Sequence, residues 1–461
     1  MAETARALSL KILLTLLAVT FGLVGCSTTK PAAKKPAPAT ALAPSAKASP
    51  PAASAETTGR VLLGIDVLAA NGFAAVKGKR LGLLTHPAGV NRQGVSTVEV
   101  LRRAPGVNLV ALYAGEHGVY GNLPAEKKYP DQIDPRTGLM VYSLYSGVAY
   151  KGKSFKASPA QLKGIDALVV DLQDIGTRSY TFTSAMKLAV EACFENGKEV
   201  IILDRPNPLG GLKVDGPSLD AAWMSYVGAF RVPYVHGLTM GELARLVRDA
   251  RAPEGIDVTE AQRAAGKLTI IPMRGWNRSM RWSETGLNWV PTSAGIQDFA
   301  AVQGYPMTGL GTYLGGFRSG VGNQHIFRGV SHKIATRDVL EKELRALNLA
   351  GVQFRVISVP NAKTGQPAVG LYAEITDYDA WRPTELGFQL MRLACKLEPK
   401  NPFTAAKPGE QNGFIRHMGS EAFMRALQRD GARIDLDFWF KQWREQARLY
   451  QQKSKRYWLY Q

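Results

Sequence analysis

The chain has 461 residues, with 57 Lys and Arg against 38 Asp and Glu, and its formal net charge is +19. Its 45% hydrophobic and 21% charged residues are ordinary for a globular protein and exclude a disordered, collagen-like or wholly membrane-embedded chain. Three cysteines exclude a scaffold built from disulfides and a cysteine-rich zinc or iron–sulfur module.

The N-terminus has the organisation of a bacterial export signal. Basic residues precede an apolar run over 12–24, which is too short to cross a bilayer as a helix because that takes about 20 residues. The run ends in Leu23-Val24-Gly25-Cys26, which resembles the lipidation signal of lipoproteins. We therefore expect residues 1–26 to be a signal peptide with Cys26 as the lipidated residue; the alternative is a plain secretory signal with an incidental cysteine. Ser27 follows the cysteine, which resembles the pattern of lipoproteins that are exported to the outer membrane. We therefore expect the protein to be anchored there and to face the periplasm.

Residues 27–58 are rich in Ala, Pro, Lys, Ser and Thr, and contain no aromatic residue. Such a segment cannot bury a core, so we expect a disordered linker between the lipid and the folded body. Residues 1–58 hold six of the basic and two of the acidic residues, which leaves the body near +15. An exported basic body faces the cell wall or the membrane surface rather than nucleic acid, although the charge can also serve solubility alone.

From residue 59 onward, apolar strands alternate with helices, which favours a mostly parallel sheet covered on both faces. The expected strands are 80–84, 107–113, 139–144, 167–170, 199–203 and 268–273, and the expected helices are 94–104, 157–163, 182–196 and 240–247. The pattern changes near residue 291, and helices are expected at 337–347, 385–397 and 442–451. We predict an α/β fold, with a Rossmann-like catalytic domain at 59–292 and a smaller α+β domain at 293–461.

Polar clusters follow four of these strands. They are Thr85-His86, Gly115-Glu116-His117, Asp171 to Arg178, and Asp204-Arg205-Pro206-Asn207. Ligands of open α/β sheets bind at the carboxyl ends of the strands, so these clusters are expected to form one site, although turn chemistry explains some of them. No dinucleotide fingerprint and no phosphate-binding loop follows the first strand, so no nucleotide cofactor is expected.

Two carboxylates flanking a bond are the minimum apparatus for glycoside hydrolysis. Glu116 is the leading candidate, because the glycines around it leave space for a ligand. Asp174 and Asp204 are candidates for the second carboxylate, with Arg178 and Arg205 nearby to keep them ionised or to hold an anionic substrate group. Structural salt bridges are the alternative role for each of them.

Three histidines raise a metal site as an alternative. His86, His117 and His236 could join Glu116 and Asp174 as ligands. No metal motif of fixed spacing is present, and no nucleophile elbow follows a strand, so neither a metal nor a serine triad is predicted.

The same residues resemble the family of exo-β-N-acetylmuramidases, which cut terminal N-acetylmuramic acid from peptidoglycan fragments. The matching stretches are Lys79 to Thr85, Glu116-His117-Gly118, Asp171 to Arg178 with Tyr180, Asp204 to Pro208, and Val235 to Thr239 with Gly241 to Ala244. The resemblance implies a Rossmann-like domain with a cleft against a smaller domain, and an essential catalytic Glu116. With it, we expect Glu116, Asp174 and His117 to be catalytic, and Thr85, Arg178, Tyr180, Asp204, Arg205, Asn207 and His236 to bind a muramyl sugar.

The second half departs from the family's pattern. The family usually carries a tract rich in Glu, Gly, Thr and Asn after a tyrosine–proline step, here Tyr305-Pro306, whereas residues 309–318 of this chain lack the acidic position. Residues 323–333 are also unusual. Region 309–333 therefore bears on substrate range, and it motivates an alternative function: a lipoprotein that binds wall fragments without cutting them.

Overall fold

The computed structural model describes residues 60–124, 127–147, 149, 152–360 and 365–461. The described residues belong to one compact unit. The predicted signal peptide at 1–26, the linker at 27–58 and the lipidation site Cys26 lie outside the described residues. Among the helices that the structure describes, none has both the length and the apolar character that crossing a membrane requires.

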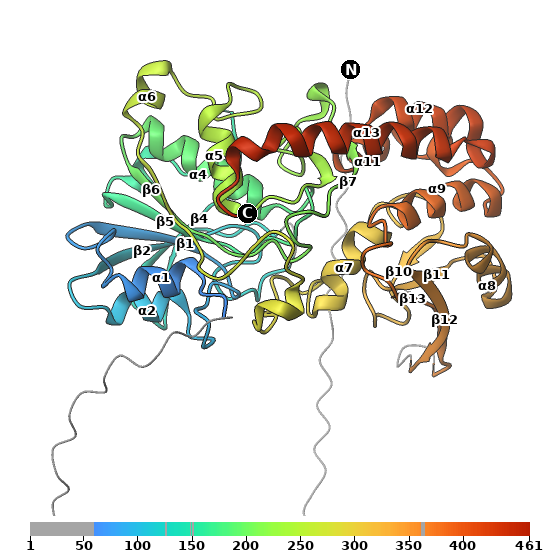
Figure 1. Ribbon diagram of the computed structural model, residues 1–461, viewed down its shortest axis with the longest axis horizontal. Helices are drawn as coiled ribbons and strands as arrows, with labels where there is room; N and C mark the ends of the chain where they lie inside the picture. The colour runs from blue at the N-terminus through green and yellow to red at the C-terminus, as the bar shows by residue number, and fades with distance from the viewer. Residues whose placement is uncertain (1–59, 125–126, 148, 150–151, 361–364) are drawn as a thin grey trace, which may run out of the picture. The chain divides into compact units, whose positions relative to one another are not determined.

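A seven-stranded sheet forms the first part of the body (Figure 1). Its order is β3-β4-β2-β1-β5-β6-β9; all neighbours pair in parallel except β3, which runs antiparallel to β4. The strands are β1 (Arg80–Thr85), β2 (Asn108–Ala114), β3 (Gln132–Ile133), β4 (Met140–Ser143), β5 (Ala167–Asp171), β6 (Glu199–Leu203) and β9 (Leu268–Ile271). The predicted mostly parallel α/β sheet is therefore confirmed.

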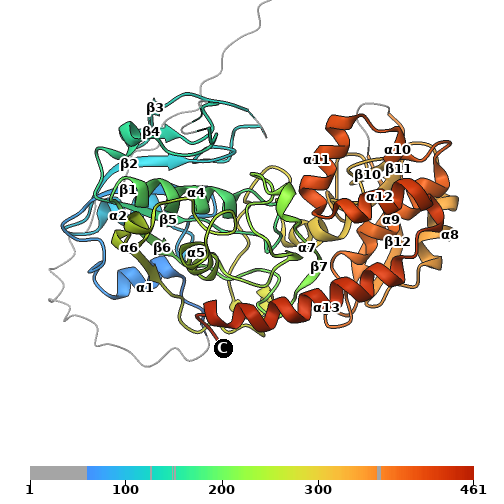
Figure 2. The same ribbon diagram turned by 90° about the horizontal axis from the view of Figure 1, so that it is seen from above.

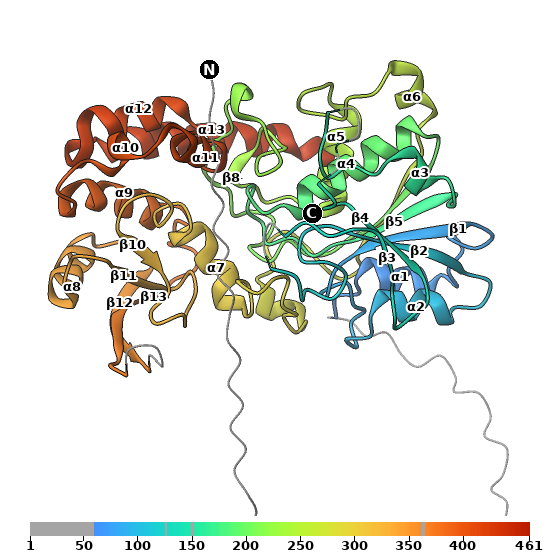
Figure 3. The same cartoon turned by 180° about the vertical axis from the view of Figure 1, so that it is seen from behind.

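Helices cover both faces of this sheet, as Figures 1 and 3 show. The helices are α1 (Gly64–Ala70), α2 (Thr97–Arg103), α3 (Pro159–Leu162), α4 (Phe182–Glu195), α5 (Met240–Asp249) and α6 (Glu260–Ala265). Successive strand residues point to opposite faces, so Val170 and Ile202 pack in one core with α4 and α5, whereas Val169 and Ile201 pack in another with α1 and α2. This double burial explains why the strands are almost wholly apolar.

The second part of the body has a four-stranded antiparallel sheet of order β10-β11-β13-β12. Its strands are β10 (Phe317–Ser319), β11 (Gly329–His332), β12 (Val352–Val359) and β13 (Ala368–Ile375). Earlier in the chain, β7 (Asp215–Ser218) and β8 (Pro233–Val235) form a separate two-stranded antiparallel hairpin. The helices are α7 (Phe299–Thr308), α8 (Arg337–Ala346), α9 (Glu385–Leu397), α10 (Pro402–Ala405), α11 (Pro408–Met418), α12 (Glu421–Asp430) and α13 (Leu436–Ser454). The smaller α+β part is thus confirmed, whereas its predicted boundary at 292/293 stays a prediction.

Residues 309–322 are rich in glycine, which favours a loop, but they do not form a loop throughout. After turns that follow α7, the chain forms the edge strand β10, whose first residue, Phe317, is buried. A buried aromatic residue and pairing with β11 outweigh the low strand preference of the surrounding glycines.

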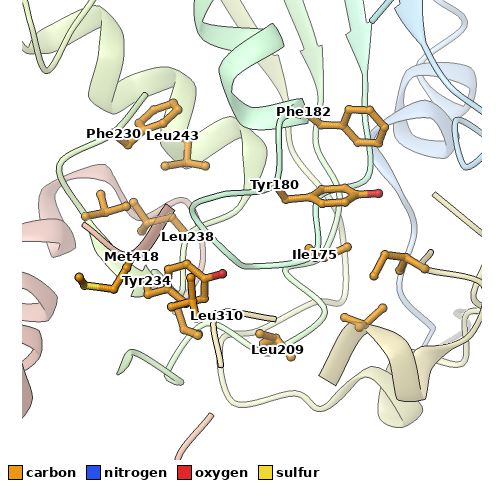
Figure 4. Packing of buried hydrophobic residues seen from close by; sticks show 14 of the residues in the cluster. Ile175, Tyr180, Phe182, Leu209, Phe230, Tyr234, Leu238, Leu243, Leu310 and Met418 are labelled. Carbon is orange, nitrogen blue, oxygen red and sulfur yellow. The ribbon is translucent and has the colours of Figure 1, made fainter. Parts of the chain in front are cut away.

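The C-terminal segment packs on the first part of the body. Helix α13 leads the chain back toward α5 (Figure 2), where Arg245 donates hydrogen bonds to the carbonyls of Tyr457 and Trp458. Tyr450 donates to the carbonyl of His236, and Tyr460 donates to Asp204 at the end of β6. One hydrophobic core, part of which Figure 4 shows, accordingly includes residues of both parts.

Candidate active site

Glu116 stands two residues after the end of β2, at the carboxyl edge of the sheet. The hydroxyl of Tyr129 donates to the carbonyls of Ala114 and Gly115 at 2.9 and 2.8 Å, which fixes the backbone before the glutamate. Thr181 Oγ1 donates to Glu116 Oε2 at 2.9 Å, and the side chain is half-buried. The carboxyl group is therefore oriented by the segment that precedes α4.

That segment, residues 179–181, also reaches α7. Ser179 Oγ shares hydrogen bonds with the hydroxyls of Tyr234 at 2.9 Å and Tyr305 at 3.3 Å. Tyr180 donates to Thr292 Oγ1 at 2.6 Å, and its ring, labelled in Figure 4, meets those of Phe182 and Tyr305 edge-on. Three consecutive residues thus connect the Glu116 carboxyl group with a phenol from the second part of the body.

Tyr305 is a candidate functional residue that the sequence reasoning missed. Burial raises the pKa of its hydroxyl, and the negative charges of Glu116 and Asp174 raise it further. The phenol therefore lies within electrostatic reach of both proposed catalytic carboxylates. The signal for it in the sequence was the tyrosine–proline step, which by itself did not indicate a position beside Glu116.

Asp174 lies on the same edge, in the segment that follows β5. Its Oδ2 accepts from the N–H of Gly176 at 2.8 Å and is 3.3 Å from Nε2 of His236. Nδ1 of His236 accepts from the N–H of Leu238 at 3.2 Å, so Nε2 is the ring nitrogen that carries a proton on the side of Asp174. Asp174 Oδ1 is buried and has no hydrogen-bond partner within the part of the chain that the structure describes. This oxygen is a free acceptor for a sugar hydroxyl or a water molecule.

His86 and His117 also lie at this edge of the sheet. Nε2 of His86 accepts from the N–H of Gln173 at 2.8 Å, and burial, followed by the charge of Arg205, lowers the pKa of His86 to about 3. His86 is therefore neutral with its proton on Nδ1. His117 follows Glu116 with φ 69°, and its Nδ1 donates to the carbonyl of Leu123 at 2.9 Å. Positive φ at a non-glycine residue is often found where a site demands it.

Comparisons with known proteins show the family of the chain. The family model for the N-terminal domain of exo-beta-N-acetylmuramidase NamZ matches residues 81–300, and the model for its C-terminal domain matches residues 303–460. The peptidoglycan beta-N-acetylmuramidase NamZ of Bacillus subtilis (strain 168) is 36% identical over 367 residues, which are 77% of this chain and 84% of that protein. The chain belongs to the NamZ family.

Two crystal structures of DUF1343 family proteins from Bacteroides fragilis show the same architecture. One has a TM-score of 0.76 and 34% identity, covering 87% of this chain and 100% of that one. The other has a TM-score of 0.63 and 25% identity, covering 87% and 99%. The resemblance inferred from the sequence is confirmed at the level of family and fold.

Other predicted site residues of this NamZ family member make internal contacts instead. Arg205 donates to both oxygens of the buried Asp171, at 2.5 and 2.9 Å, and to the carbonyl of Val90. The expectation that it keeps Asp204 ionised is wrong, because its side chain is engaged one strand away. Thr85 Oγ1 donates to the Asp171 carbonyl at 3.2 Å, and Asn207 is held in a turn by Leu209 and Leu238.

Asp204 is fully buried and has four donors. They are the N–H groups of Arg205 and Gly241 and the hydroxyls of Thr239 and Tyr460, at 2.6 to 3.0 Å. Burial nevertheless raises the pKa of Asp204 to about 6. Its contacts tie β6 to α5 and to the C-terminus, which is a structural role.

Arg178 is buried among backbone carbonyls rather than beside Asp174, so the predicted pairing with Asp174 is wrong. Its Nη1 donates to Pro217 and Val232 at 2.7 Å, and its Nη2 donates to Met418 at 2.8 Å. Burial lowers the pKa of this guanidinium to about 10. Arg178 thus fastens the end of α11 to the β7–β8 hairpin.

The structure brings together Glu116, His117, Asp174, Tyr180, His236 and His86 on one edge of the sheet. Their catalytic or binding roles stay predictions. No three His, Cys, Asp or Glu side chains among the described residues are grouped to hold a metal ion.

Proposed function

We propose that this protein is an exo-acting glycoside hydrolase that releases terminal N-acetylmuramic acid from peptidoglycan fragments. The observation that carries the proposal is the Glu116 carboxyl group, oriented by Thr181 at the sheet edge of a NamZ family chain. The buried Oδ1 of Asp174, which has no hydrogen-bond partner among the described residues, lies on the same edge. The curated relative from Bacillus subtilis bears the name of that activity.

In this mechanism Glu116 acts as the general acid and base. It protonates the leaving glycosidic oxygen as the bond to the anomeric carbon breaks, and the Asp174 carboxylate stabilises the positive charge that develops at that carbon. The ionised Glu116 then takes a proton from the water that attacks the same carbon, which releases N-acetylmuramic acid. Asp174, which His236 orients, is the second carboxylate; its Oδ1 accepts a hydrogen bond from the sugar or from water. Tyr305, whose hydroxyl shares a hydrogen bond with Ser179 Oγ, is the proposed donor to a sugar oxygen.

The test is the direction of cleavage. We expect the purified protein to release free N-acetylmuramic acid from N-acetylmuramyl-N-acetylglucosamine, followed by mass, and to leave the disaccharide of reversed order intact. Cleavage of both disaccharides would contradict exo-specificity for the muramyl end. Binding of the first disaccharide without release would favour the alternative, a wall-fragment-binding lipoprotein.

We also propose that Cys26 is lipidated and holds the enzyme in the outer membrane, facing the periplasm. The lipidation signal, followed by a Pro- and Ala-rich spacer, supports this location. The full chain expressed with an alkynyl fatty acid should carry the label and sediment with membranes, and Cys26→Ser should lose both properties. Unchanged labelling of Cys26→Ser would overturn the proposal.

A further inference from the structure

A cavity of about 670 Å³ lies in the second part of the body. It is lined by three elements: the loop and first turn of α7 over residues 294–301, the segment 323–328, and Tyr372 of β13. Segment 323–328 falls in the region where the sequence departs from the family's usual pattern. The catalytic mechanism above makes no use of this cavity.

Arg328 is the buried cation of this cavity. The residue is only 5% exposed; its Nε donates to the carbonyl of Ala373 at 2.7 Å and its Nη1 to Gln303 Oε1 at 3.2 Å. The guanidinium lies 4.9 Å from the centre of the Tyr372 ring. Within the described residues no carboxylate lies within salt-bridge distance of Arg328, although Asp298, which caps α7, and Glu374 act on it from farther away. An anionic ligand stabilises a buried guanidinium whose other partners are neutral.

The backbone that presents Arg328 is held in an unusual conformation. His325 and Phe327 have φ of 52° and 65°, in the left-handed region that side chains with a Cβ rarely adopt. Phe327 is fixed from both sides, because its N–H donates to Ser319 Oγ and its carbonyl accepts from Thr308 Oγ1, each at 2.8 Å. Such strain persists only where the surrounding structure imposes it, and here it places Arg328 in the cavity wall.

The same segment connects the cavity with the candidate active site. The Phe327 ring packs edge-on against the Tyr305 ring at 4.9 Å. The Tyr305 hydroxyl shares a hydrogen bond with Ser179, two residues before the Thr181 that donates to Glu116. In addition, Arg178 and Arg205, which the sequence offered for an anionic substrate group, are occupied by internal carbonyls and by Asp171. A substrate carboxylate therefore needs another cation near Tyr305.

We propose that this cavity is a carboxylate-binding subsite in which Arg328 receives the acidic side group of a muramyl substrate. The inference rests on the proposed function and names the part of the substrate that this cavity takes. The carboxylate comes either from the lactyl group of the sugar or from a peptide attached to it, since both present the same planar anion to a guanidinium.

The test compares Arg328→Gln with Arg355→Gln. Arg355 on β12 is a matched control, because its guanidinium lies 4.4 Å from the same Tyr372 ring but is exposed and does not line the cavity. The substrates are the muramyl disaccharide, its lactyl methyl ester, and a disaccharide with an attached peptide. We expect Arg328→Gln to raise KM for the free acid about tenfold or more, to leave the ester unchanged, and Arg355→Gln to change neither.

The outcomes separate the two proposals. An effect with the free acid identifies the lactyl carboxylate, and an effect with the peptide-bearing substrate alone identifies the peptide carboxylate. Equal effects on acid and ester, or no effect on any of the three substrates, overturn the subsite while the activity stands. Wild type that neither cleaves nor binds the disaccharide overturns both. If Arg328→Gln does not fold, Arg328→Lys takes its place, because lysine keeps the positive charge. We expect Arg328→Lys to retain part of the preference for acid over ester. A folded Arg328→Lys variant that no longer binds the disaccharide would contradict recognition of the carboxylate by charge.

Discussion

At the scale of single residues, burial sets the protonation state of His86. The unfolded side chain titrates near 6.5, whereas burial lowers the folded pKa to about 3. Between these values the unfolded state binds a proton that the folded state does not, so stability falls as the pH drops below 6.5. At pH 4.5 this amounts to about 2–3 kcal/mol, since each pKa unit corresponds to about 1.4 kcal/mol.

His86→Gln tests this assignment. The glutamine oxygen can still accept from the N–H of Gln173, but it cannot take up a proton. We expect the loss of unfolding free energy between pH 7.5 and pH 4.5, measured by urea denaturation, to be smaller in the variant by about 2–3 kcal/mol. Asp204 and the other acids titrate in both proteins and cancel in this difference. An equal loss in both proteins would contradict a depressed His86 pKa.

The sequence predicted the location of those site residues that directly follow a strand. Glu116, His117 and Asp174 were placed at one edge because parallel strands bring their carboxyl ends together. The partners of Arg178 and Arg205 were not predictable, because a guanidinium can satisfy itself with carbonyls as well as with a nearby carboxylate. Tyr305 lies too far along the chain for local pattern to connect it with Glu116.

At the scale of elements, the cap of α5 joins a helix to the sheet. Thr239 Oγ1 accepts from the N–H of Glu242 at 3.2 Å and donates to Asp204 Oδ2 at 2.8 Å. The sequence predicted the helix at 240–247. It did not predict the second hydrogen bond, which depends on where β6 ends.

Thr239→Ala should therefore lower the unfolding free energy by more than the loss of an ordinary helix cap does. We expect about 2–3 kcal/mol of unfolding free energy, because the helix loses its cap and the buried Asp204 loses a donor. Thr259→Ala is the control: Thr259 caps α6 in the same way with Gln262 but is exposed, so about 1 kcal/mol or less is expected. Equal losses of unfolding free energy in the two variants, measured by urea denaturation, would mean that the contact with Asp204 adds no stability.

At the scale of the whole molecule, long-range hydrogen bonds join the two parts of the body. The contact from Arg178 to Met418 spans 240 residues, and that from Tyr460 to Asp204 spans 256. The sequence predicted both parts in their chain order, because periodic apolar patterns are local. It could not predict that the C-terminus returns to the first part, because no local pattern encodes contacts at such separations.

We therefore expect both parts to unfold together. Arg178→Gln removes the charged fork that carbonyls of both parts share, so its unfolding free energy should fall by about 3 kcal/mol or more. Circular dichroism and tryptophan fluorescence should report one transition in both proteins, at a lower midpoint in the variant. Two separated transitions, or a shift seen by one probe alone, would show that the parts unfold independently.

The most direct test of the central claim is turnover of N-acetylmuramyl-N-acetylglucosamine by wild type and Glu116→Gln. Glutamine keeps the size of the side chain and an acceptor for the Thr181 hydroxyl, but it cannot exchange a proton. We expect release of free N-acetylmuramic acid to fall by about 10²–10⁴-fold while binding of the disaccharide, measured by calorimetry, is retained. Undiminished release by Glu116→Gln would contradict the assignment of Glu116 as the catalytic acid and base.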